Sequence, residues 1–287
     1  LNMSGSENKL KWVIQSKSSY FDFNLSELFS YYHLLFRLVR KEFLINYQQT
    51  LLGPLWVLFQ PILTTVTFVF VFNKVIGVAV GGKMPPVLFY FSGIVLWNFF
   101  NESFLATSKV FRDNFHLFSK VYFPRLIIPL ALTLTQFLRF LIQLALLVLI
   151  LSYFILFKDF NITFTWYLLL LPLVVFTAGM ISLSIGLFFS IITAKYRDLT
   201  NFVEISLRLL MFATPIIYPL SLVKEDLRWI VALNPLTSLF ELFRLGLLGE
   251  GTVSPYQLLY SLVFMIISFF AAILLFNKQG AKLIDVM

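Results

Sequence analysis

Six long apolar stretches limit the fold of this chain more than any other feature of its sequence. A helix needs about 20 mostly apolar residues to cross the hydrocarbon core of a bilayer. Each stretch reaches that length, and more polar connections separate them. The stretches are Leu52–Phe72, Val87–Thr107, Leu126–Phe154, Trp166–Thr193, Asn201–Leu222 and Pro255–Phe276. We therefore predict an all-α integral membrane protein with six transmembrane helices.

The composition agrees with a membrane protein and excludes several kinds of site. Of the 287 residues, 59% are hydrophobic and 13% are charged, whereas soluble domains average about 45–50% apolar and about 25% charged residues. The chain has no cysteine, which excludes disulfides and thiolate metal ligands. The histidines His33 and His116 lie far apart, in no metal-binding spacing. We expect no metal site.

The distribution of positive charge predicts the orientation. Lys and Arg lie mostly in the N-terminal segment, the second-to-third and fourth-to-fifth connections, and the tail. Cytoplasmic loops of membrane proteins are rich in these residues. We therefore place these segments and both termini in the cytoplasm, which accounts for the net charge of +8 without nucleic-acid binding. The first 24 residues lack the apolar core of a signal peptide, so we expect the chain to begin in the cytoplasm.

The chain divides into four parts on this reading. Residues 1–24 form an N-terminal cytoplasmic extension, 25–50 an interfacial helix, 51–278 the membrane domain, and 279–287 a tail. The interfacial helix is predicted from apolar residues at helical spacing between Leu25 and Phe43, with cations mostly on another face. Such a helix lies at the membrane surface near anionic headgroups. A helix packed on a partner protein is the alternative.

The connection from about residue 219 to 254 is long and only moderately polar. Asn234–Gly249 within it is apolar at helical spacing but too interrupted to span a bilayer. We predict short re-entrant helices in the outer leaflet, shielded by the rest of the protein because unpaired backbone groups cannot face lipid.

Polar side chains recur at helical spacing inside several of the stretches. A charge at the bilayer centre costs at least about 2.5–3.5 kcal/mol, so it normally faces a partner or water. We interpret these residues as the lining of a polar path, together with Trp56, whose ring could stack on a sugar. They are Gln60, Thr64 and Thr67 in the first stretch, Gln136, Arg139 and Gln143 in the third, and Glu204, Arg208 and Met211 in the fifth.

A buried structural network is the alternative interpretation of the same residues. Glu204 and Arg208 are four residues apart and could neutralise each other on one helix. Glu102 in the second stretch is a candidate partner for Arg139 on the antiparallel third. The sequence leaves both interpretations open.

No catalytic pattern stands out. Gly77, Gly82 and Lys83 match the start of a phosphate-binding loop, but Met84 replaces the required Ser or Thr. A phosphate-binding loop also joins a strand to a helix, whereas this segment joins two membrane stretches. We expect that this chain does not hydrolyse ATP.

Six segments, in chain order, resemble the permease subunits of ABC transporters that export polysaccharides. The similarity extends from about Leu34 to Phe276. The segments are YQQTLLGPLWVLFQPILT, FYFSGIVLWNFF, KVYFPRLIIPL, AKYRDLTNFVEI, ATPIIYP and LNPLTSLFELFR. The resemblance implies two permeases and two ATPase subunits in the bacterial inner membrane. ATP and Mg²⁺ would bind the ATPase, so this chain would need no cofactor.

The substrate implied by the resemblance is a glycan, such as O-antigen, capsule or teichoic acid, on an undecaprenyl pyrophosphate carrier. We assign Arg37, Arg40 and Lys41 of the interfacial helix to the pyrophosphate, because cations near headgroups attract phosphate. Two other readings stay open. One is a similarly folded exporter of drugs or small lipids, and the other is a glycan flippase or transferase without an ATPase.

The resemblance also implies a coupling helix at residues 108–123, which would contact the ATPase. An ordinary positively charged loop would explain Lys120 but not the aromatic residues beside it. Pro124 would begin the third span and transmit movement of the coupling helix to it. The predicted ATPase contacts are Phe111, Asn114, Phe115, Leu117, Phe118 and Lys120, with Tyr196, Arg197 and Asp198 in the other cytoplasmic loop.

Overall fold

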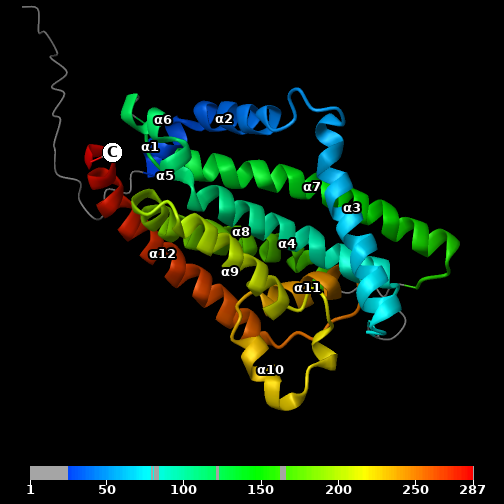
Figure 1. Cartoon of the computed structure of the whole chain (residues 1–287). Helices are drawn as coiled ribbons and strands as arrows, with labels where there is room; N and C mark the ends of the chain where they lie inside the picture. The colour runs from blue at the N-terminus through cyan, green and yellow to red at the C-terminus, as the bar shows by residue number, and fades with distance from the viewer. Residues whose placement is uncertain (1–24, 79, 81–83, 121–122, 162–165, 287) are drawn as a thin grey trace, which may run out of the picture.

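The regular structure of the described chain is entirely helical (Figure 1). The computed structural model describes residues 25–78, 80, 84–120, 123–161 and 166–286, and their side chains except those of 25–27, 119–120 and 280–286. The predicted extension at residues 1–24 lies outside these ranges, as do Gly82 and Lys83. The prediction of an all-α fold is confirmed for the described residues.

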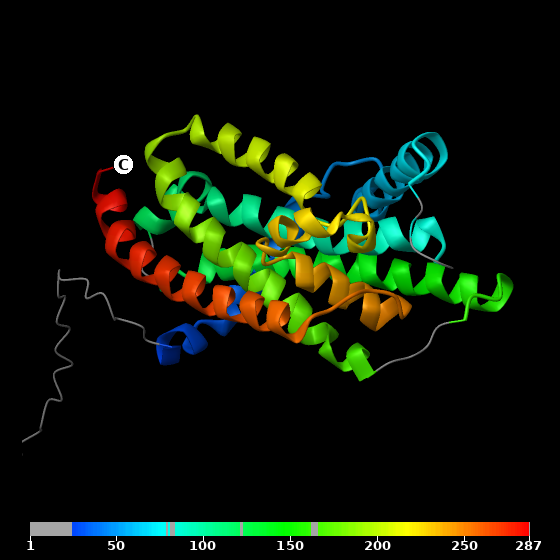
Figure 2. The ribbon, with the colours of Figure 1, turned by 90° about the horizontal axis from the view of Figure 1, so that it is seen from below.

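Four long helices run side by side, and a fifth lies across them (Figures 1 and 2). The four are α4 (Pro86–Ser108), α7 (Ile127–Phe157), α8 (Leu171–Lys195) and α12 (Pro255–Val286), and the fifth is α3 (Trp56–Phe68) with its π-helical continuation η2 (Val69–Val75). α8 packs against α12 and α4, while α4 also packs against α7 and α3. α4 is thus enclosed by three other helices.

By length and composition, four described helical segments can cross a membrane, or five if one bent pair counts as a span. The four correspond to the first, third, fourth and sixth predicted stretches. They are Gly53–Val75, Ile127–Phe157, Trp166–Lys195 and Pro255–Gln279. The second stretch forms α4, which is 23 residues long but carries Asn98, Asn101 and Glu102. Its enclosure explains why it tolerates these polar residues.

The fifth predicted stretch, Asn201–Leu222, is not one continuous helix. α9 (Leu199–Ala213) ends where Thr214 becomes extended before Pro215, because a residue preceding proline is disfavoured in the helical region. Arg244, almost fully buried, donates to the carbonyls of Pro215 and, at 3.0 Å, of Ile216. A side chain from another helix therefore satisfies two backbone carbonyls of the non-helical segment that follows α9.

The region between α9 and α12 forms the short helices that the sequence predicts. η4 (Leu220–Leu222) and α10 (Glu225–Ala232) precede α11 (Thr237–Leu248). α10 and α11 are bent by 99° at their break. α11 is almost completely buried, with Glu241 of α11 3.7 Å from Arg244.

The segment before α3 forms α1 (Leu25–Ser30) and α2 (Tyr32–Ile45), and α2 packs along α7. Its apolar stripe divides into two halves. Leu35 and Val39 face the protein, whereas Phe36 is 65% exposed. Figure 1 shows α1 and the end of α12 at the same end of the bundle, beside α5 (Val110–Asp113) and α6 (Phe115–Lys120).

Gly186 permits the closest contact between α4 and α8. A Cβ atom at this position would overlap the Thr107 hydroxyl and lie 3.1 Å from the Phe104 carbonyl oxygen. Small residues allow such close approach between membrane helices.

We predict that Gly186→Ala lowers the free energy of unfolding by about 1–3 kcal/mol, the usual cost of overpacking a filled interior. Thermal unfolding in detergent would measure the loss. Ala145→Leu, on an exposed face of α7, is the matched control and should leave the midpoint nearly unchanged. Equal stability of the two variants would show that α4 and α8 shift apart enough to accommodate the added methyl group, and that the contact at Gly186 does not limit their packing.

Candidate functional site

A polar pocket lies between α3, α4 and α7, and the segment after α2 also lines it. Its volume is about 230 Å³. Five of the predicted path residues line it: Trp56, Gln60, Gln136, Arg139 and Gln143. The other lining residues are Asn46, Tyr47, Val57, Asn98, Phe99, Glu102 and Phe140. Residues far apart in sequence therefore form one amide-rich surface with aromatic walls.

The amide of Gln143 compensates for a hydrogen bond that Pro61 removes from α3. Proline inside a helix removes the hydrogen bond to the carbonyl four residues earlier, which in α3 is the carbonyl of Val57. Gln143 of α7 donates its Nε2 to that carbonyl at 3.1 Å. Gln143 thus stabilises the α3–α7 contact, while its Oε1 is buried and makes no hydrogen bond to the described residues.

Arg139 occupies the centre of the polar side chains. Its Nη1 donates to Oε1 of Gln136 at 3.1 Å, and its guanidinium carbon lies 5.4 Å from the Tyr47 ring centre. The suggested ion pair with Glu102 is not found among the described residues, although both line the pocket; Glu102 accepts from Asn101 at 3.0 Å instead. Nε of Arg139 is buried and makes no hydrogen bond to the described part of the chain.

Tyr47 stays protonated at neutral pH. Burial raises the pKa of its phenol, the Arg139 guanidinium opposes that rise, and Glu102 adds to it. A protonated phenol both donates and accepts hydrogen bonds. The pocket therefore offers hydroxyl, amide, cationic and anionic groups, and a polar ligand rich in hydroxyls fits this set.

The remaining predicted path residues lie outside this pocket. Thr64 and Thr67 donate to carbonyls of α3 itself, at 3.0 and 2.9 Å. On α9, Arg208 is exposed and Met211 packs against the main core. Glu204 pairs with Lys109, with Nζ 2.7 Å from Oε1, rather than with Arg208. The predicted path residues therefore form two groups, one on α3 and α7 and the other on α9, and α4 packs against all three helices.

The predicted coupling segment forms α5 and α6, and its aromatic residues do different things. Phe111 is 2% exposed and stacks on Phe276 of α12, with ring centres 4.8 Å apart. Leu117 and Phe118 are partly buried against the apolar cluster that contains Phe111 and Phe276. Phe115 is partly exposed and belongs to neither of the two apolar clusters of the described residues. Phe111 therefore stabilises the bundle, and Phe115 is the more accessible apolar residue.

Six other residues named in the coupling prediction lie at this end or in the other loop. Asn114 is partly buried and donates to the Val110 carbonyl at 3.2 Å. The side chain of Lys120 lies outside the described side chains. α7 begins at Ile127, so Pro124 precedes its first turn rather than forming it. The other predicted ATPase contacts, Tyr196, Arg197 and Asp198, are all exposed in the turn between α8 and α9.

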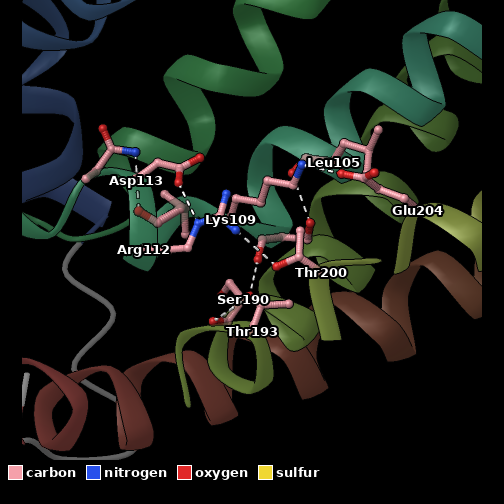
Figure 3. Close-up of polar contacts among 11 residues, drawn as sticks. Leu105, Lys109, Arg112, Asp113, Ser190, Thr193, Thr200 and Glu204 are labelled. Atoms are coloured by element: carbon pink, nitrogen blue, oxygen red, sulfur yellow. Dashed lines mark hydrogen bonds and ion pairs between the residues drawn. The ribbon is translucent and has the colours of Figure 1, made fainter. Parts of the chain in front are cut away.

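Polar contacts join the predicted coupling segment to α8 and α9, the helices on either side of the other predicted coupling loop (Figure 3). Besides the Lys109–Glu204 pair, Nη1 of Arg112 donates to the Thr200 hydroxyl at 3.1 Å. The Thr193 hydroxyl donates to the Ser108 carbonyl. We call the two contacts that reach α9, Lys109–Glu204 and Arg112–Thr200, the α4–α9 network, because Lys109 and Arg112 directly follow the end of α4.

Arg37, Arg40 and Lys41 are exposed on α2. The side chains of Phe29 on α1 and Phe36 on α2 are exposed as well. This arrangement is typical of a helix at a membrane interface, with cations beside headgroups and rings in the acyl boundary.

A family model described as ABC-2 type transporter matches residues 33–248. The chain belongs to this family. It is therefore a multi-pass membrane protein, and its family implies a partner ATPase.

This ABC-2 transporter chain is also similar to curated relatives over most of its length. An O-antigen export system permease protein RfbA of Klebsiella pneumoniae is 28% identical over 268 residues, covering 92% of this chain and 98% of the relative. One of Myxococcus xanthus is 30% identical over 216 residues, covering 74% and 79%. The resemblance seen in the sequence motifs is confirmed.

Several residues of the pocket and of the contacts with α9 were not singled out from the sequence. Asn46 and Tyr47 precede the first span and were given no place in the predicted path. Asn98 stands four residues before Glu102, so the same helical spacing could have identified it. Lys109 was counted only as a loop charge, and its partner Glu204 is 95 residues away.

Cysteine labelling distinguishes a water-filled pocket from a sealed network. We predict that Gln60→Cys and Asn98→Cys react with a membrane-impermeant thiol reagent, because the reactive thiolate forms in water. The chain has no cysteine of its own, so the background is clean. Mass spectrometry of the purified protein would measure the modified fraction.

Leu149→Cys is the matched control. Leu149 is 67% exposed on the apolar surface of α7 and should react only with a lipid-soluble reagent. If the two pocket cysteines behave like this control, the pocket is closed to water and the structural network is the correct interpretation.

Proposed function

We propose that this chain is the membrane-spanning subunit of an ATP-driven exporter of O-antigen-like glycan carried on undecaprenyl pyrophosphate. The observation that supports it most is the match to O-antigen export permeases over 98% of the length of a relative. A shared fold alone would fit exporters of many substrates. Similarity along the whole chain, with a pocket rich in amides, favours a glycan.

The proposed assembly is a homodimer of this permease with two ATPase subunits in the bacterial inner membrane. Each permease would span six times, with both termini in the cytoplasm. α4 would be the second span, and α9 with the non-helical segment that follows it would be the fifth. The bent pair α10–α11 would re-enter the outer leaflet. In support, α9 has a wide apolar surface with no partner in the described chain: Phe202, Ile205, Leu209 and Phe212 are each 55–65% exposed.

The glycan would pass along the face of the bundle that carries α3, α4 and α9. Asn and Gln side chains both donate and accept hydrogen bonds, so they suit sugar hydroxyls. Trp56, 46% exposed at the pocket, would stack on the apolar face of a sugar ring. Thr64, Thr67, Arg208 and Met211 would line the same path beyond the pocket.

The cations of α2 would hold the carrier's pyrophosphate. Arg37, Arg40 and Lys41 are exposed and close together on one helix, so they can converge on one anionic group. Each cation near a membrane surface contributes about 1 kcal/mol of attraction to anionic lipid.

Reconstitution with the ATPase subunit tests the function. We predict that a glycan on undecaprenyl pyrophosphate stimulates ATP hydrolysis by the complex in liposomes. Replacing Arg37, Arg40 and Lys41 by Gln should raise the half-saturating glycan concentration roughly a hundredfold, because three attractions of about 1 kcal/mol are lost. Lys158→Gln, an exposed cation at the opposite end of α7, is the control.

Two results would contradict these assignments. Stimulation by small lipids or drugs, with no response to the glycan, would replace the proposed substrate. An unchanged half-saturating concentration in the triple variant would mean that α2 anchors the protein and does not hold the pyrophosphate.

The ATPase would dock on the exposed residues of the two coupling loops. Phe115 of α6 and Tyr196, 50% exposed after α8, are the apolar candidates. Exposed apolar side chains that gather among polar ones often mark a contact surface. Phe111, which packs inside the bundle, would support this surface from beneath.

We predict that Phe115→Asp prevents co-purification of the ATPase. An unpaired carboxylate buried in an interface costs about 3–5 kcal/mol, more than a hundredfold in affinity. Leu222→Asp, at a side chain 53% exposed near α10, is the matched control and should leave the complex intact. Normal complex formation by Phe115→Asp would move the docking surface to Tyr196, Arg197 and Asp198.

A further inference from the structure

α9 is packed less extensively than α4, α7 and α8. Its buried residues are Thr200, Val203 and Leu207, a single narrow stripe. It packs mainly against α4 and α8. The opposite face of α9 is the exposed apolar surface described above. A helix with so few buried side chains can shift at little cost in packing free energy.

The polar contacts that hold α9 come from the start of the predicted coupling segment. Lys109 follows α4 directly and pairs with Glu204 at 2.7 Å. Arg112, on α5, reaches Thr200 at 3.1 Å and also contacts its neighbour Asp113 at 2.8 Å. Figure 3 shows Lys109 and Arg112 pointing from α4 and α5 toward α9. Two cations from one short segment therefore contact the same helix, one turn apart.

The segment that carries these cations is firmly packed. Val110 is fully buried, and Phe111 stacks on Phe276 of α12. The Ser108 carbonyl accepts a hydrogen bond from Thr193 of α8. A force applied to α5 and α6 therefore acts on a packed unit, and this unit contacts α9 through Lys109 and Arg112.

We propose that Lys109 and Arg112 are positioning residues that transmit movement of the coupling segment to α9, with the Lys109–Glu204 pair as the main connection. The proposal rests on the proposed function. It differs from the expectation that Pro124 passes the movement to the third span. α7 packs against α2, α3, α4 and α8, whereas α9 borders the face along which the glycan would pass. Moving α9 would widen that path.

Charge reversal tests the connection. Lys109→Glu and Glu204→Lys each replace an attraction with a repulsion, and the double variant restores opposite charges. For each single variant we expect glycan export per ATP hydrolysed to fall roughly tenfold, within the range of coupling between linked sites. The ATPase should still co-purify and hydrolyse ATP. The double variant should recover most of the coupling.

A chemical bridge supplies a second measurement. We expect the variant carrying Lys109→Cys and Glu204→Cys to lose coupling, and a short bifunctional thiol reagent to restore it by joining α4 to α9. A monofunctional reagent of similar size should not restore it. The reagent must join only the two introduced cysteines. This chain has no other cysteine, so the ATPase partner used in the experiment must be cysteine-free as well.

The outcomes separate this proposal from the proposed function. Glu225→Lys reverses one charge of an exposed pair on α10 and should leave export per ATP unchanged. If single reversals couple normally, or if the bridge blocks export instead of restoring it, α9 does not move with the coupling segment and the proposal fails. Absence of glycan export by the wild-type complex would instead overturn the proposed function.

Discussion

The enclosure of α4 by α3, α7 and α8 is the constraint on which the rest of the structure depends. A helix facing lipid must be apolar, but a helix surrounded by protein can carry polar groups if they find partners or water. From Asn98 onward, the partly exposed residues of α4 follow one helical stripe: Asn98, Asn101, Glu102, Leu105, Ala106 and Lys109. This stripe begins in the polar pocket and ends at the pair with Glu204. The close α4–α8 contact at Gly186 keeps the opposite face of α4 sealed.

Polar side chains from distant helices donate hydrogen bonds to backbone carbonyls near two prolines, Pro61 and Pro215. Pro61 frees the Val57 carbonyl, and Gln143 satisfies it at the polar pocket. Pro215 ends α9, and Arg244 donates to the carbonyls of Pro215 and Ile216 in the segment that follows, while its guanidinium carbon lies 3.7 Å from the centre of the Phe89 ring. In each case a polar side chain on a distant helix is needed because lipid offers no hydrogen bonds. Gln143 and Arg244 therefore stabilise the backbone of these segments.

The coupling end combines a packed interior with an exposed surface. Phe111 and Phe276 fix the segment to the bundle, while Phe115 and Tyr196 remain accessible. The α4–α9 network lies between these two layers. Its Lys109–Glu204 pair is partly exposed, with side chains 21% and 37% accessible, so water and salt weaken it. A connection of moderate strength would suit the movement of α9 that we propose.

The sequence by itself determined the helical class, the membrane location, the two short helices near the end and the family. These follow from apolar length, helical spacing and local motifs, all of which act over neighbouring residues. It also identified Gln136, Arg139 and Gln143 as a stripe, because residues three and four apart share a helix face. The continuous fifth helix was wrong because Pro215, read as part of an apolar run, forces Thr214 out of the helical conformation.

Only the tertiary structure decided which side chains meet. Glu204 had a suitable partner four residues away in Arg208, yet it pairs with Lys109, which is 95 residues distant. Phe111 and Phe115 look alike in sequence, but one is buried and the other is accessible. Tyr47 reaches Arg139 only because the chain turns back after α2. Such choices depend on how the helices pack against one another, and packing places side chains by distance in space, which local patterns along the chain do not contain.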